Sequence, residues 1–355
     1  MRLKRALANN LRHSLGWRTT EKLIVINVDD YGTIRTQSPS ALEALRSAIP
    51  GFGGFMDERD ALETREDLES LFDVLRRHRG ADNRPAVFTA YALSANPDLA
   101  WMRQARSYRF EWLPQTFERL AAEQPSAYEG AWALWAEGMR EGLIHPQFHG
   151  REHMNVPLLE AKLARGDHDL VVNLEHGCMA GLQPIEEMPG VGFTQSFKLH
   201  DRSVLDRHRE ILSEGMEGFE SIYGFRSRTF TPPAQKLHAS LENFVYSRGV
   251  EAIDKPFFGR QPTGNRPGRW RINFLQRPSQ RRAGTLVRNA VFEPTNTTAS
   301  DPVGQALRQI ESAFQWKKPA IVSSHRVNYS GHIDPDHRRR GLEKLDALLG
   351  GITQR

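Results

Sequence analysis

The stretch LIVINVDDYG, residues 23–32, begins as an apolar run rich in β-branched side chains and ends in two aspartates. Val and Ile pack well on a pleated, buried surface, so residues 23–28 are predicted to form a strand. The run stops abruptly at Asp29 and Asp30.

Similar apolar runs recur along the chain and alternate with longer amphipathic stretches. Further strands are predicted at residues 86–92, 143–149, 170–174, 229–232, 250–253, 286–292 and 320–324. Helices are predicted at residues 59–79, 113–140, 156–166, 202–222, 235–248, 302–316 and 335–350. Such alternation predicts an α/β fold in which seven or eight units form a distorted parallel (β/α) barrel.

We expect one barrel domain over residues 22–350, preceded by a basic extension over residues 1–21. Residues 259–282 are rich in Gly, Pro, Gln and Arg, and are predicted to form a long loop excursion. No stretch reaches the roughly 20 apolar residues that cross a bilayer, and the N-terminus lacks the apolar core of a secretory signal. The single Cys178 excludes an internal disulfide. Together these features predict a cytoplasmic location.

The formal net charge of +5 is compatible with an acidic partner such as nucleic acid, an anionic glycan or a membrane surface. Acidic residues are interspersed throughout, which favours basic side chains spread over exposed helix faces. No basic and aromatic motif of a nucleic-acid reader occurs, so no nucleic-acid partner is expected. Leu3, Leu7 and Leu11 recur at a helical spacing beside basic residues. This spacing predicts a weak peripheral contact with the inner face of a membrane.

Chemically capable side chains stand where several predicted strands end. In β/α barrels the reactive groups gather at the carboxyl ends of the strands, so these side chains are expected to share one site. The residues in question are Asp29 and Asp30, His149 and His153, Glu175 and His176, and His325.

Two adjacent carboxylates at a strand end repel each other and are hard to bury together. A bound cation would hold one of them ionised and leave the other free to accept a proton. The alternative is an acidic loop in which one Asp caps the next helix and Gly32 permits the turn. On this motif alone both interpretations stay open.

His145, His149 and His153 are spaced by four residues. Residues four apart in a strand are separated by roughly 13 Å, too far for one metal ion. In a helical turn the same spacing brings side chains within roughly 6 Å. Pro146 favours an extended conformation at His145, so we choose His149 and His153 as ligands, with His145 as a lesser candidate. Together with Asp30 they would supply the three protein ligands of a catalytic zinc-type site.

The last predicted strand ends at His325, which could protonate a leaving group or, alternatively, only hydrogen-bond within the barrel rim. Arg326 adds a polar group beside it that could bind substrate. Arg288 and Glu293, in LVRNAVFEP, could orient these groups or bind substrate. Aromatic residues could stack on sugar faces, and we single out Tyr31, Trp270 and Phe257.

With these residues assembled, the chain resembles the polysaccharide deacetylase superfamily, the NodB-like carbohydrate esterases. VDDYG at residues 28–32 matches the first motif, which implies Asp29 as catalytic base and Asp30 as metal ligand. HGREH at residues 149–153 matches the second motif, two histidines that bind the metal. FTPPA at residues 230–234 looks like the third, which would place Pro232 in the substrate site. The strand ending at His325 matches the last motif and implies a general acid.

The chain also departs from this family. Thr231 stands where the third motif usually has an Arg that orients the catalytic aspartate. Arg226, Arg228 or Arg288 could take its place in space. The family's Asp-Trp segment, which orients the acid histidine, has no clear counterpart, and Asp254 is only a candidate.

The resemblance implies a metal-dependent hydrolase that uses a divalent metal, most simply zinc. It would remove an acyl group, most simply acetyl, from an amino sugar or an acylated surface polysaccharide. Two alternatives remain: an amide or glycoside hydrolase on the same fold, and a catalytically silent barrel that binds a glycan or membrane surface. The missing third-motif Arg gives weight to the silent barrel.

Overall fold

The computed structural model describes residues 13–260, 268–279, 282–296 and 300–354. The predicted membrane contact of residues 3–12 lies outside the described residues, as does most of the basic extension. Among the described residues, no helix has the length and apolar character needed to cross a membrane.

Eight parallel strands form the central sheet, in the order β10-β7-β6-β5-β2-β1-β12-β11. The two strands at its edges, β10 and β11, are joined in the chain by residues 287–289 only. The sheet therefore curls into the predicted distorted barrel, which stays open between these two strands. The strands are β1 (Ile24–Tyr31), β2 (Phe88–Leu93), β5 (Ile144–Gly150), β6 (Thr229–Phe230), β7 (Ala252–Asp254), β10 (Gly284–Leu286), β11 (Ala290–Val291) and β12 (Ala320–His325).

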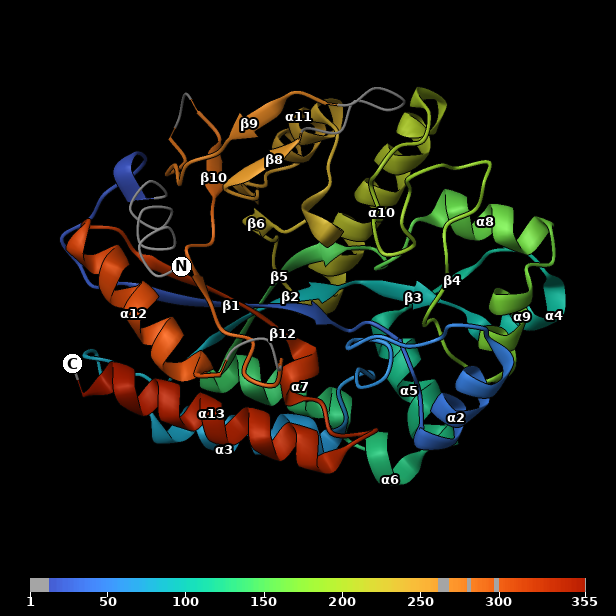
Figure 1. Cartoon of the computed structure of the whole chain (residues 1–355), viewed down its shortest axis with the longest axis horizontal. Helices are drawn as coiled ribbons and strands as arrows, with labels where there is room; N and C mark the ends of the chain where they lie inside the picture. The colour runs from blue at the N-terminus through green and yellow to red at the C-terminus, as the bar shows by residue number, and fades with distance from the viewer. Residues whose placement is uncertain (1–12, 261–267, 280–281, 297–299, 355) are drawn as a thin grey trace.

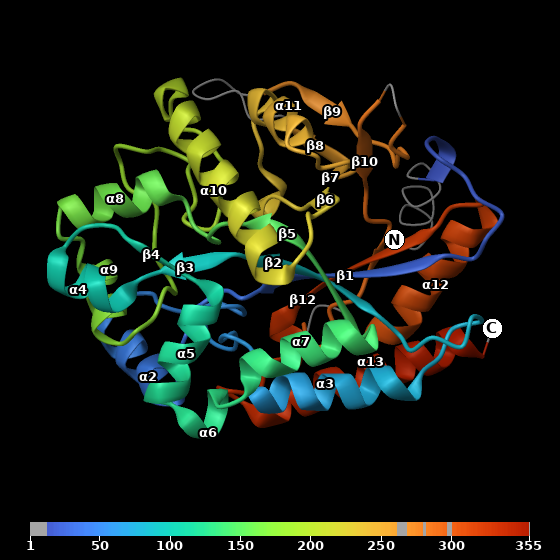
Figure 2. The same cartoon turned by 180° about the vertical axis from the view of Figure 1, so that it is seen from behind.

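Helices surround this sheet (Figures 1 and 2), with α3, α7 and α13 along one side and α10 and α11 on the other. Their apolar faces meet the strands in one extended core. The bounds are α2 (Pro39–Ala48), α3 (Arg65–Arg77), α4 (Leu99–Ala105), α5 (Leu113–Glu123), α6 (Pro125–Tyr128), α7 (Ala131–Glu141), α8 (Val156–Ala164), α9 (His168–Glu175), α10 (Leu205–Tyr223), α11 (Ala239–Ser247), α12 (Pro302–Gln315) and α13 (Pro335–Thr353).

Most of the predicted elements are present, and the differences have local causes. The single helix expected at 113–140 is three helices, because Pro125 begins a new one and Gly130 adopts a positive φ of 79°. The strand expected at 286–292 is divided into β10 and β11 by residues 287–289. The loop expected at 259–282 contains part of a hairpin, β8 (Phe258–Arg260) with β9 (Trp270–Ile272). A further short pair, β3 (Ala95–Pro97) with β4 (Phe110–Trp112), was not predicted.

One prediction was wrong in kind. Residues 170–174 do not form a strand but lie within α9, which Asp167 caps by accepting a hydrogen bond from the Leu170 N–H. A short apolar run is compatible with a buried helix as well as a strand, and only the cap distinguishes them. Glu175 and His176 consequently lie exposed at the end of this helix and not at the end of a barrel strand.

Candidate metal centre and catalytic site

Asp29 and Asp30 end β1, and a local irregularity turns both carboxylates into the same site. In a regular strand, successive side chains point to opposite faces of the sheet. Here the register of β1 with β2 shifts between Val28 and Tyr31, and Asp30 has a left-handed φ of 75°. Such a bulge re-aims side chains and is tolerated by Asp better than by most residues. The two acids can therefore act together although they are neighbours in the chain.

A second irregularity places His149. The pairing of β2 with β5 passes from Ala92 opposite Phe148 to Leu93 opposite Gly150, so His149 is the extra residue of a bulge. Gly150 has a φ of 135°, a conformation that L side chains rarely adopt. The chain then turns sharply enough to bring His153 beside His149, with their ring centres 5.0 Å apart.

Asp30, His149 and His153 form the group of described residues that could hold a metal ion, with ligand atoms all within 4.8 Å of one another. Oδ1 of Asp30 lies 3.3 Å from Nε2 of His149 and 3.1 Å from Nε2 of His153. Ligand atoms of a tetrahedral site with bonds of about 2.1 Å lie about 3.4 Å apart, so the spacing fits such a site.

The hydrogen bond of His149 supports the same assignment. Its Nδ1 lies 2.7 Å from the carbonyl oxygen of Thr231, which can only accept, so Nδ1 carries the proton. With Nδ1 held in this way, Nε2 is the ring nitrogen left to face Asp30, which is the arrangement of a histidine that binds a metal through Nε2. The donor set therefore fits a divalent metal of the zinc type.

Arg35 lies on the other side of Asp30 and was not predicted from the sequence. Its Nη2 is 3.6 Å from Oδ2 of Asp30, and Asp57 and Asp60 hold the rest of the guanidinium. Burial raises the pKa of Asp30, but His153 and His149 outweigh it and keep this pKa well below its usual range. Asp30 is therefore ionised and presents Oδ1 to the two histidines.

Arg288 holds Asp29. It leaves the short link between β10 and β11 and donates from Nη1 and Nη2 to the two carboxylate oxygens, each at 2.7 Å. Its Nε donates to Asp254 at 2.6 Å, and Thr231 accepts a further hydrogen bond at 3.2 Å. Burial raises the pKa of Asp29, but the charges of Arg288, His149 and His325 and the hydrogen bonds from Arg288 together outweigh it, and the net shift is downward. Burial dominates at Asp254, whose pKa is raised.

Of the three arginines considered for the missing third-motif position, the structure brings only Arg288 to Asp29. Arg226 and Arg228 are exposed and pair with Glu220 and Glu251. Arg288 lies in the link between β10 and β11, more than 50 residues after the position where the third motif has its Arg, so a motif search could not find it. The sequence signal was an Arg in an apolar segment without a nearby acid in the chain.

His325 lies opposite Asp29 because β1 and β12 pair in register at these two residues. Its Nε2 is 4.0 Å from Oδ2 of Asp29, and its Nδ1 is 2.7 Å from Oε1 of Glu293. Burial lowers the pKa of this ring, but the hydrogen bond and charge of Glu293, with Asp30 and Asp29, raise it to about 9. Glu293, and not Asp254, therefore orients this histidine, and Asn328 donates to the other oxygen of Glu293 at 2.6 Å.

Three predicted site residues lie elsewhere. Tyr31 is buried and packs edge-on against Trp135, so it cannot stack on a sugar. Arg326 is buried and donates hydrogen bonds to Asp60, Glu63 and a backbone carbonyl, which excludes substrate contact. His145 is exposed near the start of β5 and stacks on Phe225, outside the Asp30 group. Each follows or begins an apolar run, a pattern that does not show which way a side chain points.

Two of the three residues between His149 and His153, namely Arg151 and Glu152, anchor the loop that carries these histidines. Arg151 donates to Glu152 at 2.7 Å, and both side chains are buried. Tyr108 donates to Glu152, and Glu214 of α10 accepts from Arg151. This network ties the histidine loop to α10 and to the segment before β4, so the ligand pair does not depend on a free surface turn.

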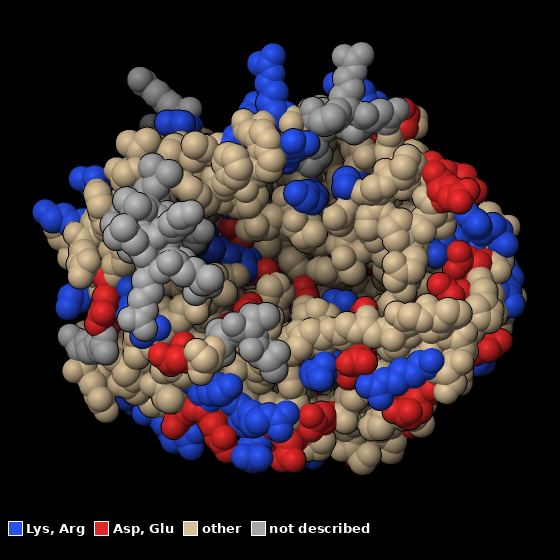
Figure 3. Space-filling view, in the orientation of Figure 1, with Lys and Arg blue, Asp and Glu red and all other residues tan. Residues whose placement is uncertain are grey.

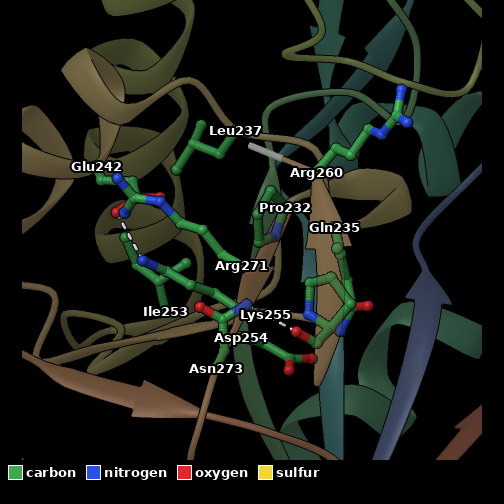
Figure 4. Close-up of a pocket in the computed structure, with 12 residues that line it drawn as sticks. Pro232, Gln235, Leu237, Glu242, Ile253, Asp254, Lys255, Arg260, Arg271 and Asn273 are labelled. Carbon is green, nitrogen blue, oxygen red and sulfur yellow. Dashed lines mark hydrogen bonds and ion pairs between the residues drawn. The ribbon is translucent and has the colours of Figure 1, made fainter. Parts of the chain in front are cut away.

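The site opens on one face of the molecule. Figure 3 shows this face hollowed near its centre, over the carboxyl ends of the central strands, with acidic and basic groups on the floor. The side chain of His325 is 37 % exposed, while those of Asp29 and Asp30 are 10 % and 4 % exposed. The histidine is thus the part of the group that meets solvent first. Pro232 lines a separate cavity beside Asp254 (Figure 4).

Comparison with solved structures finds similar folds at low identity. A 4-alpha-glucanotransferase from Thermococcus litoralis has a TM-score of 0.44 and 8 % identity over 94 % of this chain, which spans only 38 % of that protein. A protein from Pseudomonas aeruginosa PAO1 described as a probable polysaccharide deacetylase has a TM-score of 0.42 and 11 % identity, covering 94 % and 85 % of the two chains. Puue allantoinase has a TM-score of 0.42 and 10 % identity, covering 96 % and 87 %.

Solved structures described as polysaccharide deacetylases are thus among the matches, with TM-scores of 0.42 and 0.30. No family model and no curated protein significantly matches the chain. The TM-scores and identities are low, so these matches do not assign a function to this chain.

Proposed function

We propose that this protein is a metal-dependent hydrolase that removes an acyl group, most simply acetyl, from an amino sugar or an acylated polysaccharide. The observation that carries the proposal is the arrangement around Asp30, in which two imidazole nitrogens lie 3.1 and 3.3 Å from one carboxylate oxygen. A second carboxylate and a histidine whose pKa is raised to about 9 lie beside that group. Metal, base and acid are the parts that acyl hydrolysis by water requires.

Asp30, His149 and His153 would hold the metal, which we take to be zinc because the ligands are two imidazoles and one carboxylate. A bound zinc ion lowers the pKa of water and polarises an acyl carbonyl. The remaining steps belong to side chains of this chain.

Asp29 is placed to take the proton of the attacking water. Arg288 is shared between Asp29 and Asp254, so the three groups together carry one negative charge. When Asp29 accepts a proton, the group formed by Asp29, Asp254 and Arg288 becomes neutral. This gain offsets part of the decrease that Arg288 causes in the pKa of Asp29. Arg288 also fixes the direction of the carboxylate through two hydrogen bonds, and this geometry is specific to a guanidinium.

His325 is placed to protonate the leaving amine or alkoxide. Glu293 accepts from Nδ1, so a protonated ring presents the Nε2 proton toward the space beside Asp29. The 4.0 Å between Nε2 and Asp29 Oδ2 is too long for a hydrogen bond and leaves room for a reacting atom between the two groups. The silent-barrel alternative drew its weight from the absence of an Arg at residue 231, and Arg288 removes that objection.

The direct test is product identification with the full-length protein, loaded with zinc. We expect acetate release from an N-acetylated or O-acetylated oligosaccharide, measured by an enzyme-coupled assay and by mass spectrometry of the sugar. Asp29→Asn should reduce the rate by about 100-fold or more, since general base catalysis contributes about that factor. Cleavage of glycosidic bonds with the acetyl groups intact would instead identify a glycoside hydrolase.

The dependence on pH tests the role of His325. Glu293→Gln removes a charge and changes the hydrogen bond at Nδ1, so the pKa of His325 should fall from about 9 toward or below its ordinary 6.5. A histidine with a raised pKa stays protonated up to that pKa, so the wild type should lose activity only as the pH passes about 9.

In the variant, the alkaline limb of kcat/KM against pH should move down by about one unit or more. Thermal unfolding of both proteins checks that the variant is folded. An unmoved alkaline limb in a folded Glu293→Gln protein would contradict the role of His325 as the acid.

A further inference from the structure

The positive charge of this protein is concentrated in one segment. Residues 255–292 contain nine Lys and Arg and no Asp or Glu, whereas the rest of the chain has 39 basic and 43 acidic residues. The net charge of +5 therefore arises from this segment alone. Local charge of one sign raises the concentration of oppositely charged ligands near it.

The described arginines of this segment differ from most surface arginines of the protein. Elsewhere exposed arginines commonly pair with an acid of the same or a neighbouring helix, as Arg65 does with Glu69 and Arg339 does with Glu343. Arg288 pairs with Asp29 and Asp254, but among the described residues no carboxylate forms an ion pair with the other arginines of this segment. These are Arg260, Arg269, Arg271, Arg277 and Arg282.

Two of these arginines line a cavity that adjoins the candidate catalytic site. The cavity lies between the β8–β9 hairpin and the ends of β6 and β7, and its wall includes Pro232 and Asp254. Asp254 is the residue that shares Arg288 with Asp29, so one side chain belongs to both the cavity and the catalytic group. Asp254 thus places this cavity directly beside the catalytic group.

Figure 4 shows how the basic side chains lie in this cavity. Arg271 and Lys255 extend to the same side, toward Glu242, and Arg260 extends to the other side. Lys255 is already neutralised, because its Nζ lies 2.6 Å from Glu242. Arg271 adds a second cation beside this pair, so the cavity wall carries positive charge that the described acids do not balance.

Arg260 is held by an aromatic ring and not by an acid. Its guanidinium lies 4.7 Å from the ring centre of Trp270, and the ring of Trp270 also stacks on Phe258 with ring centres 4.4 Å apart. A cation–π contact fixes a guanidinium without cancelling its charge. Arg260 is therefore presented in an ordered position with its full charge at the edge of the cavity.

We propose that the acylated substrate is an acidic glycan whose anionic groups bind Arg271 in the cavity beside Asp254 and Arg260 at the edge of this cavity. This inference rests on the proposed function and names its substrate class. The shared chemistry is a carboxylate or phosphate on a sugar, which a guanidinium binds through two parallel hydrogen bonds. The cavity, of about 40 Å³, has room for the carboxylate or phosphate of a neighbouring sugar and not for the whole sugar, so the acylated sugar lies outside it, beside Asp29 and His325.

The test compares acetylated oligogalacturonate with an acetylated xylo-oligosaccharide of the same length. We expect kcat/KM to be higher for the acidic oligomer, and this preference to fall about tenfold or more in Arg260→Gln/Arg271→Gln and in high salt. Arg226→Gln/Arg228→Gln also removes two charges, at exposed positions outside the cavity, and should leave the preference unchanged. Equal use of both oligomers, or an unchanged preference in the double variant, overturns the proposal.

A binding measurement separates this inference from the proposed function. Calorimetry with unacetylated oligogalacturonate and the native protein needs no catalysis, and we expect binding that the double variant weakens about tenfold or more. A phosphorylated oligomannoside in the same experiment tells phosphate from carboxylate, and binding of either anion supports the inference. If acidic oligomers bind but no acetate is released from any substrate, the proposed hydrolysis fails and the acidic-glycan site stands.

A membrane is the competing occupant of this basic region, because Phe258, Trp270 and Ile272 are each about half exposed on the outer face of the hairpin. Vesicles of phosphatidylcholine and phosphatidylglycerol test it by co-sedimentation. Vesicle binding without oligosaccharide binding overturns the proposal. Oligosaccharide binding without vesicle binding supports it.

Discussion

Asp30→Asn and His149→Ala should each weaken zinc binding by at least about a hundredfold, because even the groups behind a metal ligand contribute about 10- to 100-fold to affinity. Oδ1 of Asp30 lies near both histidines, and its loss removes the one negative charge of the proposed ligand set. The proposed acetate release should fall about a thousandfold, since a metal contributes several kcal/mol and each 1.36 kcal/mol is a factor of ten.

The measurement is zinc content after equilibrium dialysis, together with the rate of acetate release at saturating zinc. His145→Ala is the matched control, because it removes a histidine of the same strand that is exposed and stacks on Phe225. It should keep both zinc and rate. Wild-type zinc affinity in folded Asp30→Asn and His149→Ala proteins would refute the ligand assignment.

The strand ends were predictable because they follow from composition. The β-branched run before Asp29 and the apolar run before His325 both indicate strands with polar ends, and parallel pairing then brings those ends to one edge. The choice of His149 and His153 over His145 followed from spacing and from Pro146. Local patterns thus indicated which side chains would meet.

The directions of side chains could not be predicted in the same way. Whether Asp30 shares a face with Asp29 depends on a bulge and a left-handed φ, which the pairing with β2 determines and the local sequence does not. Tyr31, the next residue, points into the core against Trp135. Residues far away in the chain determine these side-chain directions, so the residues close to Asp30 in the sequence do not predict them.

The partners of the charged residues Arg326 and Arg288 could not be predicted from the sequence either. Both arginines lie in or beside apolar strand segments, and the sequence offers no reason to separate them. The structure buries Arg326 against Asp60 and Glu63, far along the chain, and directs Arg288 to Asp29 and Asp254. A buried arginine must be paired, but the identity of its partner is a property of the fold.

Arg288→Met should destabilise the protein by about 3–5 kcal/mol, the usual cost of removing one partner from a buried charge network. The substitution keeps an unbranched apolar stem but removes the guanidinium, and it leaves Asp29 and Asp254 as neighbouring carboxylates without their cation. The free energy of unfolding from chemical denaturation measures the effect. Arg226→Met and Arg228→Met, in exposed ion pairs, should each cost less than about 1 kcal/mol.

A second substitution separates charge repulsion from lost packing. Asp254→Asn in the Arg288→Met background removes one of the two unpaired carboxylates, so part of the lost stability should return. If the double variant is no more stable than Arg288→Met, the two carboxylates do not repel each other and the shared role of Arg288 is wrong.

Arg288→Lys tests orientation apart from charge. A lysine retains the positive charge, but its ammonium cannot make the two parallel hydrogen bonds to Asp29 or reach Asp254 in the same geometry. We expect a folded protein whose kcat for acetate release falls by about 10- to 100-fold, while KM changes little, because substrate does not contact Arg288 in the proposed mechanism. A Lys variant with wild-type kcat would mean that charge alone is sufficient at this position, and that the bidentate geometry around Asp29 has no catalytic role.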